Sequence, residues 1–227
     1  DDKGCTLIES TTINAPDPLT VEVLTTDAVC FEGTDGTASV NLLTGAAPLS
    51  YSWSNNTSDP IASMLSAGIY TLTVTDFNDC TFTTDFEIEQ AAQISVDLDP
   101  TNPNCFDSAD GLVEVSDVTY GGISADPADF TFEWIGIAQN GPIATGLVED
   151  SYTVLVTDVF GCSIEESIVL TSPAEMVPFI QLVDPVSCLD SEDGSLSIST
   201  LNGTAPFTYQ WGVSSNNQTG NNIFNLP

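Results

Sequence analysis

The sequence has 227 residues, of which 33 are Asp or Glu and only Lys3 is basic, so its formal net charge is −32. It contains no His and no Arg. A surface with almost only negative charge repels nucleic acid and anionic lipid, because binding to either needs Lys or Arg opposite phosphate. We therefore expect no nucleic-acid partner. Since no run of about 18 apolar residues occurs, we also expect no membrane insertion in this segment.

One sequence pattern recurs about every 80 residues, which is typical of an array of small domains. Each copy contains one tryptophan at the end of an alternating apolar segment: Leu49–Trp53, Phe130–Trp134 and Phe207–Trp211. Alternation with a period of two places the bulky residues on one face of a strand. We therefore expect Trp53, Trp134 and Trp211 to lie in the cores of successive domains.

Small residues and prolines mark the predicted joints between copies. We expect residues 1–16 to be the C-terminal end of a preceding repeat, 17–91 and 92–174 to be complete repeats, and 175–227 to be a truncated repeat. This division suggests a segment of a longer polypeptide. The second repeat has a longer loop before its tryptophan strand, within Tyr120–Asp129, where a specific feature is expected.

Six or seven strands are expected in each complete repeat, because turn residues interrupt apolar alternation every few residues. Tyr70, Leu72 and Val74 should face inward on their strand, and Tyr152 occupies the matching place in the second repeat. In the first repeat the predicted strands are Leu19–Leu24, Thr37–Leu43, Leu49–Ser54, Ile61–Met64, Tyr70–Thr75 and Thr81–Ile88. Many short strands and no helical period indicate a β-sandwich.

The six cysteines recur in phase with the repeats, which favours disulfides and an oxidising compartment over free thiols. Pairing within repeats would join Cys30 to Cys80 and Cys105 to Cys162, leaving the other two for partners beyond the ends. Pairing between neighbours along the sequence is the alternative: Cys5–Cys30, Cys80–Cys105 and Cys162–Cys188. An extended array would carry such neighbours apart, whereas a disulfide needs Cα atoms within about 7 Å. We therefore favour pairing within repeats.

Each repeat also has two acidic residues at fixed offsets after its first cysteine. These pairs are Glu32 with Asp35, Asp107 with Asp110, and Asp190 with Asp193. Calcium takes six to eight oxygen ligands, and alternating acids in a turn supply several of them. The other interpretation is that Asp-Gly forms a turn whose acids are merely solvated. Calcium is the only cofactor that the sequence suggests.

No catalytic constellation is visible. Without His, the commonest general base is absent, and without Arg the usual clamp for phosphate or carboxylate is absent as well. Adjacent acids are abundant, but among so many acidic residues adjacency carries little information. We therefore expect that this chain is not an enzyme.

The recurring residues together resemble the SprB repeat, which occurs in very large surface adhesins of gliding Bacteroidota and is related in style to PKD and other immunoglobulin-like modules. The residues that carry the resemblance are Cys30, Gly36, Gly45, Pro48, Tyr51, Trp53, Ser54, Asn55, Leu65, Gly68, Tyr70, Val74, Thr75, Asp76 and Cys80. The second repeat departs from the pattern with Asp150 in place of the glycine at position 68. The resemblance implies an outer-surface protein exported by the type IX system, with no catalytic residues.

These observations predict an all-β chain of tandem immunoglobulin-like sandwich domains in an extended array. The predicted function is that of an extracellular stalk of a large cell-surface adhesin, stiffened by disulfides and used in attachment or gliding motility. The alternatives are a self-assembling extracellular filament subunit and spacer modules of a secreted polysaccharide-degrading enzyme. Partners are expected among surface glycans, other cell-surface components and other repeats of the same chain.

Overall fold

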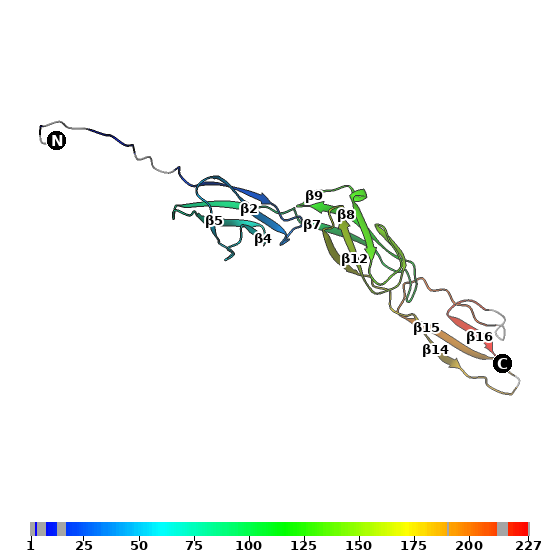
Figure 1. The fold of residues 1–227 in the computed structure, drawn as a ribbon. Helices are drawn as coiled ribbons and strands as arrows, with labels where there is room; N and C mark the ends of the chain where they lie inside the picture. The colour runs from blue at the N-terminus through cyan, green and yellow to red at the C-terminus, as the bar shows by residue number, and fades with distance from the viewer. Residues whose placement is uncertain (1–2, 4–7, 13–16, 190, 213–217, 227) are drawn as a thin grey trace. The chain divides into compact units, whose positions relative to one another are not determined.

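The computed structural model describes residues 3, 8–12, 17–189, 191–212 and 218–226, and it is built almost wholly from antiparallel β-strands (Figure 1). A single turn of 3-10 helix, η1 (Pro127–Asp129), is the only helical element of these described residues. In the same part of the chain no helix is long and apolar enough to cross a membrane. The prediction of an all-β chain is confirmed.

The first repeat forms two three-stranded sheets that face each other across a core. One sheet has the order β1-β2-β4 and the other the order β3-β5-β6. This is the strand order A-B-E and C-F-G of an immunoglobulin-like sandwich. The strands are β1 (Thr20–Thr26), β2 (Gly36–Thr44), β3 (Ser50–Trp53), β4 (Ile61–Leu65), β5 (Gly68–Thr75) and β6 (Thr81–Ile88). Each lies within a few residues of its predicted position.

The second repeat has the same two sheets, in the orders β11-β8-β7 and β10-β12-β13, and a short extra strand β9 that pairs with β8. Its strands are β7 (Ile94–Thr101), β8 (Gly111–Tyr120), β9 (Ile123–Ser124), β10 (Phe130–Trp134), β11 (Ile143–Leu147), β12 (Ser151–Asp158) and β13 (Ser163–Val169). In the third repeat the described strands β14 (Val177–Asp184), β15 (Gly194–Leu201) and β16 (Asn222–Leu226) form one sheet in the order β14-β15-β16. Every described sheet thus contains strands of a single repeat.

A buried tryptophan on the third strand organises each complete core. Trp53 is 3% exposed and Trp134 is 1% exposed, so both are core residues as predicted. The indole N–H of Trp53 donates to the carbonyl of Asp59 (2.8 Å), and that of Trp134 donates to the carbonyl of Gly141 (3.0 Å). Trp211 makes the equivalent bond to a loop carbonyl but is only half-buried. A large apolar ring can therefore be buried without leaving its one polar group unpaired.

A tyrosine near the start of the fifth strand packs against the core and bonds through its hydroxyl to the preceding turn. The Tyr70 hydroxyl donates to the carbonyl of Ser66 (3.0 Å), and the Tyr152 hydroxyl donates to the carbonyl of Val148 (3.2 Å). Both bonds reach four residues back along the chain, which is the tyrosine corner of immunoglobulin-like domains. Tyr152 is buried, whereas Tyr70 is half-buried and stacks on Phe86 with ring centroids 5.7 Å apart.

The chain divides into two compact units, which we describe separately. Unit 1 comprises Asp1–Ile94, Tyr120–Ile123 and Val159–Cys162. Unit 2 comprises Ser95–Thr119, Ser124–Asp158 and Ser163–Pro227. No described strand crosses the predicted boundaries near residues 91 and 174, but two short segments that follow strands of the second repeat are part of unit 1.

Replacing Trp53 by alanine should lower the free energy of unfolding of the first repeat by about 3–5 kcal/mol, since it removes a buried ring and leaves a cavity. Urea unfolding followed by circular dichroism measures the loss. Phe77, whose side chain is 70% exposed, is the control: Phe77→Ala should leave the midpoint almost unchanged. Equal effects of the two substitutions would show that Trp53 does not support the core.

Candidate functional site

Three turns with the same hydrogen bonds join the first two strands of each repeat, and we call them the cysteine–glycine turns (residues 27–36, 102–111 and 185–194). In the first, the backbone N–H of Val29 donates to Asp35 Oδ1 (3.1 Å), and that of Gly33 donates to the carbonyl of Cys30 (3.0 Å). The second and third turns repeat these bonds at 3.0 to 3.2 Å: Asn104 to Asp110, Ser108 to Cys105, Ser187 to Asp193 and Ser191 to Cys188. The second acid of each pair is therefore part of its own turn.

The glycine that ends each turn is required because two backbones approach closely there. A Cβ atom on Gly36 would lie 2.7 Å from the carbonyl oxygen of Leu65, and one on Gly111 would lie 2.7 Å from that of Leu147. Such distances are shorter than van der Waals contact, so a side chain would push the second strand away from the fourth. This explains why the cysteine is followed six residues later by glycine in every repeat.

Hydrogen bonds favour the ionised form of two of the turn carboxylates, Asp110 and Asp193. Bonds from the side chains of Ser108 and Asn104 and from the Asn104 backbone N–H lower the pKa of Asp110. Bonds from the side chain and backbone N–H of Ser187, and from Ser191, lower the pKa of Asp193 to about 2. Donors that bind the charged form stabilise it relative to the protonated acid. These two side chains are therefore used in folding the turn.

The first acid of each pair occupies a different place in the turn. Glu32 and Asp107 both have a φ of 55°, in the left-handed region that tight turns need, and Asp190 lies outside the described residues. Within the described part of the chain, the structure brings no three Asp, Glu, Cys or His side chains together as a metal site. Calcium binding at Glu32, Asp35, Asp107, Asp110, Asp190 and Asp193 stays a prediction.

A second kind of turn, the aspartate–cysteine turn (residues 76–80 and 158–162), joins the last two strands of each complete repeat. In the first repeat, Asp76 Oδ1 accepts the backbone N–H groups of Asn78 (2.8 Å) and Cys80 (2.9 Å), and its Oδ2 accepts that of Ala46 (3.2 Å). Burial opposes ionisation of Asp76, but bonds from Cys80, Ala46 and Asn78 outweigh it and lower the pKa. Asp76 and Asp158 are both buried, a role that sequence analysis missed although the two aspartates match between repeats.

The two kinds of turn lie at opposite ends of the sandwich. The aspartate–cysteine turn joins Thr75 to Thr81, the paired ends of β5 and β6. The cysteine–glycine turn lies beyond the other end of β6, where the backbone N–H of Ala28 donates to the carbonyl of Glu89 (3.0 Å). Since β6 has eight residues, the two ends are about 26 Å apart. The predicted pairing of Cys30 with Cys80 is therefore wrong.

The structure instead joins Cys30 to Cys162, whose Cα atoms are 5.5 Å apart. Both residues belong to unit 1, because Cys162 ends the segment Val159–Cys162. The bond thus links the cysteine–glycine turn of one sequence repeat to the aspartate–cysteine turn of the next. It closes a loop of 132 residues, which by the chain-entropy argument contributes about 5 kcal/mol.

The remaining cysteines of the described chain, Cys80, Cys105 and Cys188, are free. The predicted bond between Cys105 and Cys162 is therefore also wrong, since Cys162 pairs elsewhere. The alternative, pairing between neighbours along the sequence, is not formed either: Cys80 and Cys105 are both unpaired. Cys5 lies outside the described residues.

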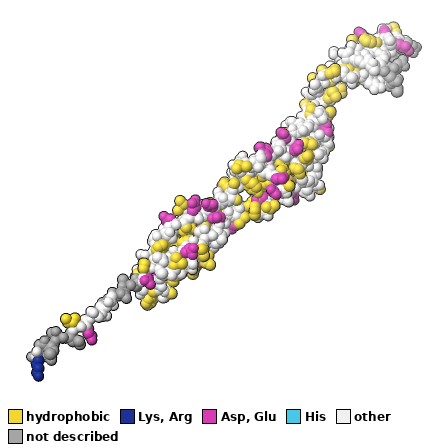
Figure 2. All heavy atoms as spheres, turned by 90° about the horizontal axis from the view of Figure 1, so that it is seen from above, with side chains coloured by type: hydrophobic (Ala, Val, Ile, Leu, Met, Phe, Trp, Pro, Cys, Tyr) yellow, Lys and Arg dark blue, Asp and Glu magenta, His cyan; other side chains and the backbone are white. Residues whose placement is uncertain are grey.

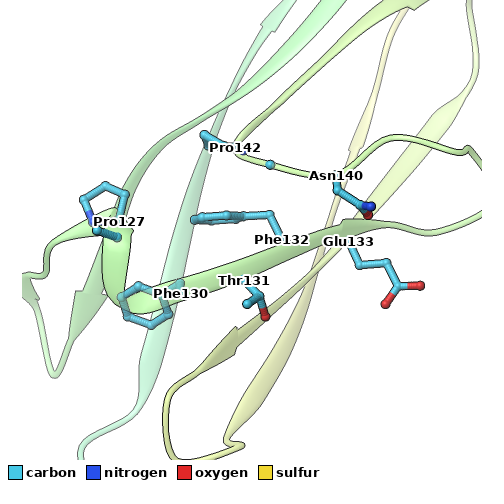
Figure 3. Close-up of a pocket in the computed structure, with 9 residues that line it drawn as sticks. Pro127, Phe130, Thr131, Phe132, Glu133, Asn140 and Pro142 are labelled. Carbon is cyan, nitrogen blue, oxygen red and sulfur yellow. The ribbon is translucent and has the colours of Figure 1, made fainter.

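The longer loop of the second repeat contributes to a recess of about 680 Å³ in unit 2. Its lining is mainly apolar, from Pro127, Phe130, Phe132 and Pro142, and Glu133 and Asn140 lie away from Pro127 in Figure 3. Both phenylalanine rings are 7% exposed, so neither offers a free face on which a sugar could stack. Among the described residues that line the recess, Glu133 is the only ionisable one, so it has no second acid or base there to act with.

The charge of the described surface is almost entirely negative. Asp and Glu side chains lie scattered among apolar and uncharged ones in Figure 2, and Lys3 is the only basic side chain drawn. Neutralising phosphate or sulfate needs several basic groups together. The expectation of no nucleic-acid partner stays a prediction.

The family model of the SprB repeat matches residues 24–58 and 182–216. Each match runs from the end of the first strand, through a cysteine–glycine turn, to just beyond the tryptophan. The corresponding part of the second repeat contains the longer loop. No curated protein matches the sequence significantly.

Among solved structures, the chain is similar to the C-terminal 282-residue fragment of intimin, determined in complex with the intimin-binding domain of the translocated intimin receptor. The identity is 13%, the match covers 71% of this chain and 67% of that one, and the TM-score is 0.34. Cadherin domains 1–4 of protocadherin gamma B7 are 13% identical, and the match covers 93% of this chain and 64% of that one with a TM-score of 0.27. At TM-scores this low the likenesses carry no argument, and the fold class rests on the chain's own sheet order.

The free energy of unfolding at low pH should depend on the carboxylate of Asp193. A carboxyl whose folded pKa is depressed stabilises the fold above its unfolded pKa and loses that contribution as the pH falls. For Asp193 this window runs from the ordinary value of 3.8 down to about 2. In acid titrations followed by circular dichroism, Asp193→Asn should flatten the loss of stability in this window. Glu192→Gln, a change at its exposed neighbour, should not; equal profiles for both variants would contradict the assignment.

The disulfide should be visible in equilibrium unfolding. A variant with both Cys30→Ser and Cys162→Ser should lose up to about 5 kcal/mol in the free energy of unfolding, because the unfolded chain regains the entropy of an open loop. Cys105→Ser is the matched control, since Cys105 lies in an equivalent turn and is unpaired here. Unreduced peptide mapping that links Cys30 to Cys80 would contradict the structure.

Proposed function

We propose that this SprB-repeat chain is an extracellular segment of a large cell-surface adhesin, in which it serves as a disulfide-stiffened stalk for attachment or gliding motility. The observation that supports the proposal is the bond between Cys30 and Cys162. It gives the chain a covalent path from one sequence repeat to the next that bypasses the residues between them. In a protein under tension, such a path transmits force without loading the residues between the two cysteines.

The mechanical argument follows from chain connectivity alone. Tension applied to the ends of the chain reaches Cys30, crosses the disulfide and continues from Cys162. Residues between the two cysteines carry none of the load, so β2 to β12 cannot be pulled out one strand at a time. A stalk with this connection gains less length when it unfolds than one without it, because the residues between the two cysteines stay closed off.

The remaining features suit an exposed stalk. Disulfides persist in oxidising compartments, which supports a location at the cell surface. Export by the type IX system is proposed from the resemblance to the SprB repeat. Net charge of one sign keeps neighbouring molecules soluble and apart. With no catalytic constellation among the described residues, we propose that the chain is not an enzyme. Its partners would be surface glycans or other cell-surface components, together with other repeats of the same chain.

Single-molecule stretching should reveal the bypass. With the disulfide intact, the contour length gained on full unfolding should be about 450 Å shorter than in the variant with Cys30→Ser and Cys162→Ser, because 132 residues then remain closed off. Cells that carry the variant in the full-length protein should attach normally at rest but detach at lower flow.

Val159→Ala is the control for both measurements, because Val159 lies in the same turn as Cys162 and is 72% exposed. A chain that extends by the same length with and without the bond would contradict the bypass. A variant that resists flow as well as the unaltered protein would contradict the role in attachment, even if the bypass exists.

A further inference from the structure

We propose that Cys80, Cys105 and Cys188 each form a disulfide of the same kind as the bond between Cys30 and Cys162. In each case the partner cysteine lies in an adjoining repeat. A series of disulfides would then join each repeat to the next, always from a cysteine–glycine turn to the aspartate–cysteine turn of the repeat that follows. The inference rests on repeat geometry and not on the adhesin role, so the two can fail separately.

Cys105 and Cys188 are presented in the same way as Cys30. In all three turns the backbone N–H before the cysteine donates to the aspartate five residues after it, at 3.0 to 3.1 Å. The frame around the second turn also matches that of the first. Asn102 Oδ1 accepts the backbone N–H of Thr171 (2.9 Å), as Asp27 Oδ1 accepts that of Glu89 (2.9 Å). Cys105 thus has both frame bonds of Cys30, Cys188 has the one within its turn, and both cysteines are exposed.

Cys80 occupies the same position in its turn as Cys162 does in the bonded turn, and it is half-buried against its own core. Both cysteines end an aspartate–cysteine turn whose aspartate is buried, 7% exposed for Asp76 and 8% for Asp158. Since this turn lies at the opposite end of the repeat from Cys30, Cys80 cannot reach a partner within its own sandwich. The partner that fits is the cysteine of a cysteine–glycine turn in the repeat before it.

The surroundings of Cys105 supply an independent observation. Cys105 and Phe106 border a cavity of about 750 Å³ in unit 2, whose other walls include Met176, Gly203 and Thr204 of the third repeat. Unit 1, to which Cys30 belongs, contains the corresponding loop of the second repeat, Tyr120–Ile123, and also the segment Val159–Cys162.

Glycines with positive φ mark this correspondence, since Gly121 (57°) and Gly203 (77°) each follow the end of a second strand. Cys105 thus borders a cavity shared with the corresponding loop of the third repeat, but it is not joined to an aspartate–cysteine turn. In the sequence, no Asp-x-x-x-Cys follows Trp211. The cavity beside Cys105 is the place where such a turn fits.

The bond forms by oxidation of two thiols. Each cysteine gives up one proton, and the pair gives up two electrons to the disulfide of a thiol–disulfide oxidoreductase in the oxidising compartment, which is reduced to two thiols. We assign the partner turn to the adjoining repeat of the same polypeptide, as for Cys30 and Cys162. Linkage within one chain gives the second thiol a high effective concentration, which a second copy of the chain lacks.

Disulfide mapping of the complete secreted polypeptide tests the inference. Free thiols are blocked with iodoacetamide, and the unreduced protein is digested with pepsin at low pH, where thiolate is absent and exchange is slow. We expect Cys105 and Cys188 in peptides bonded to Asp-x-x-x-Cys peptides, and Cys80 bonded to a Cys-x5-Gly peptide. Blocked Cys105 in most molecules would overturn the proposal, as would links between two copies of the chain.

Two further samples make the result unambiguous. In the 227-residue chain alone, iodoacetamide should label Cys80, Cys105 and Cys188, and this labelling should be lost in the complete polypeptide. In the complete polypeptide with Cys105→Ser, one new thiol should become labelled, in an Asp-x-x-x-Cys turn. Labelling in any other sequence context, or no new label, would show that Cys105 has a different partner or none.

Discussion

The order of strands in the sandwich is the constraint on which the rest of this structure depends. It places the turn between the first two strands at one end and the turn between the last two strands at the other, separated by the length of β6. A disulfide spans only a few ångströms between Cα atoms. Cysteines in the two turns of one repeat therefore cannot meet, and Cys30 bonds to Cys162 instead.

Each end of the sandwich is made rigid by a carboxylate that accepts backbone N–H groups. Asp35 and its counterparts fix the residue before the cysteine, whereas Asp76 fixes its own turn and the loop at Ala46. For Asp76, Asp110 and Asp193 these bonds also lower the pKa, so that the ionised form is favoured. The aspartates of the two kinds of turn thus help to position the cysteines, in addition to adding negative charge.

The covalent link also suits the size of the domains. A sandwich of about 75 residues buries little apolar surface and gains little net stability from its core. Trp53 and Tyr70 make that core specific by pairing their polar groups with loop carbonyls. A bond that closes a loop of 132 residues adds a contribution comparable to the whole net stability of such a domain.

The sequence by itself determined the strands, the buried tryptophans Trp53 and Trp134 and the phase of the repeats, because alternation, turn residues and glycines are local signals. It also placed the cysteines in two recurring turns. Only the tertiary structure decided that Cys30 meets Cys162, because the distance between turns depends on which end of the sandwich each occupies. The order of strands in the sheets determines which end each turn occupies, and the spacing of residues along the sequence does not reveal it. The hydrogen bonds of Asp35 and Asp76 were hidden for the same reason, since their donors are backbone groups that any residue supplies.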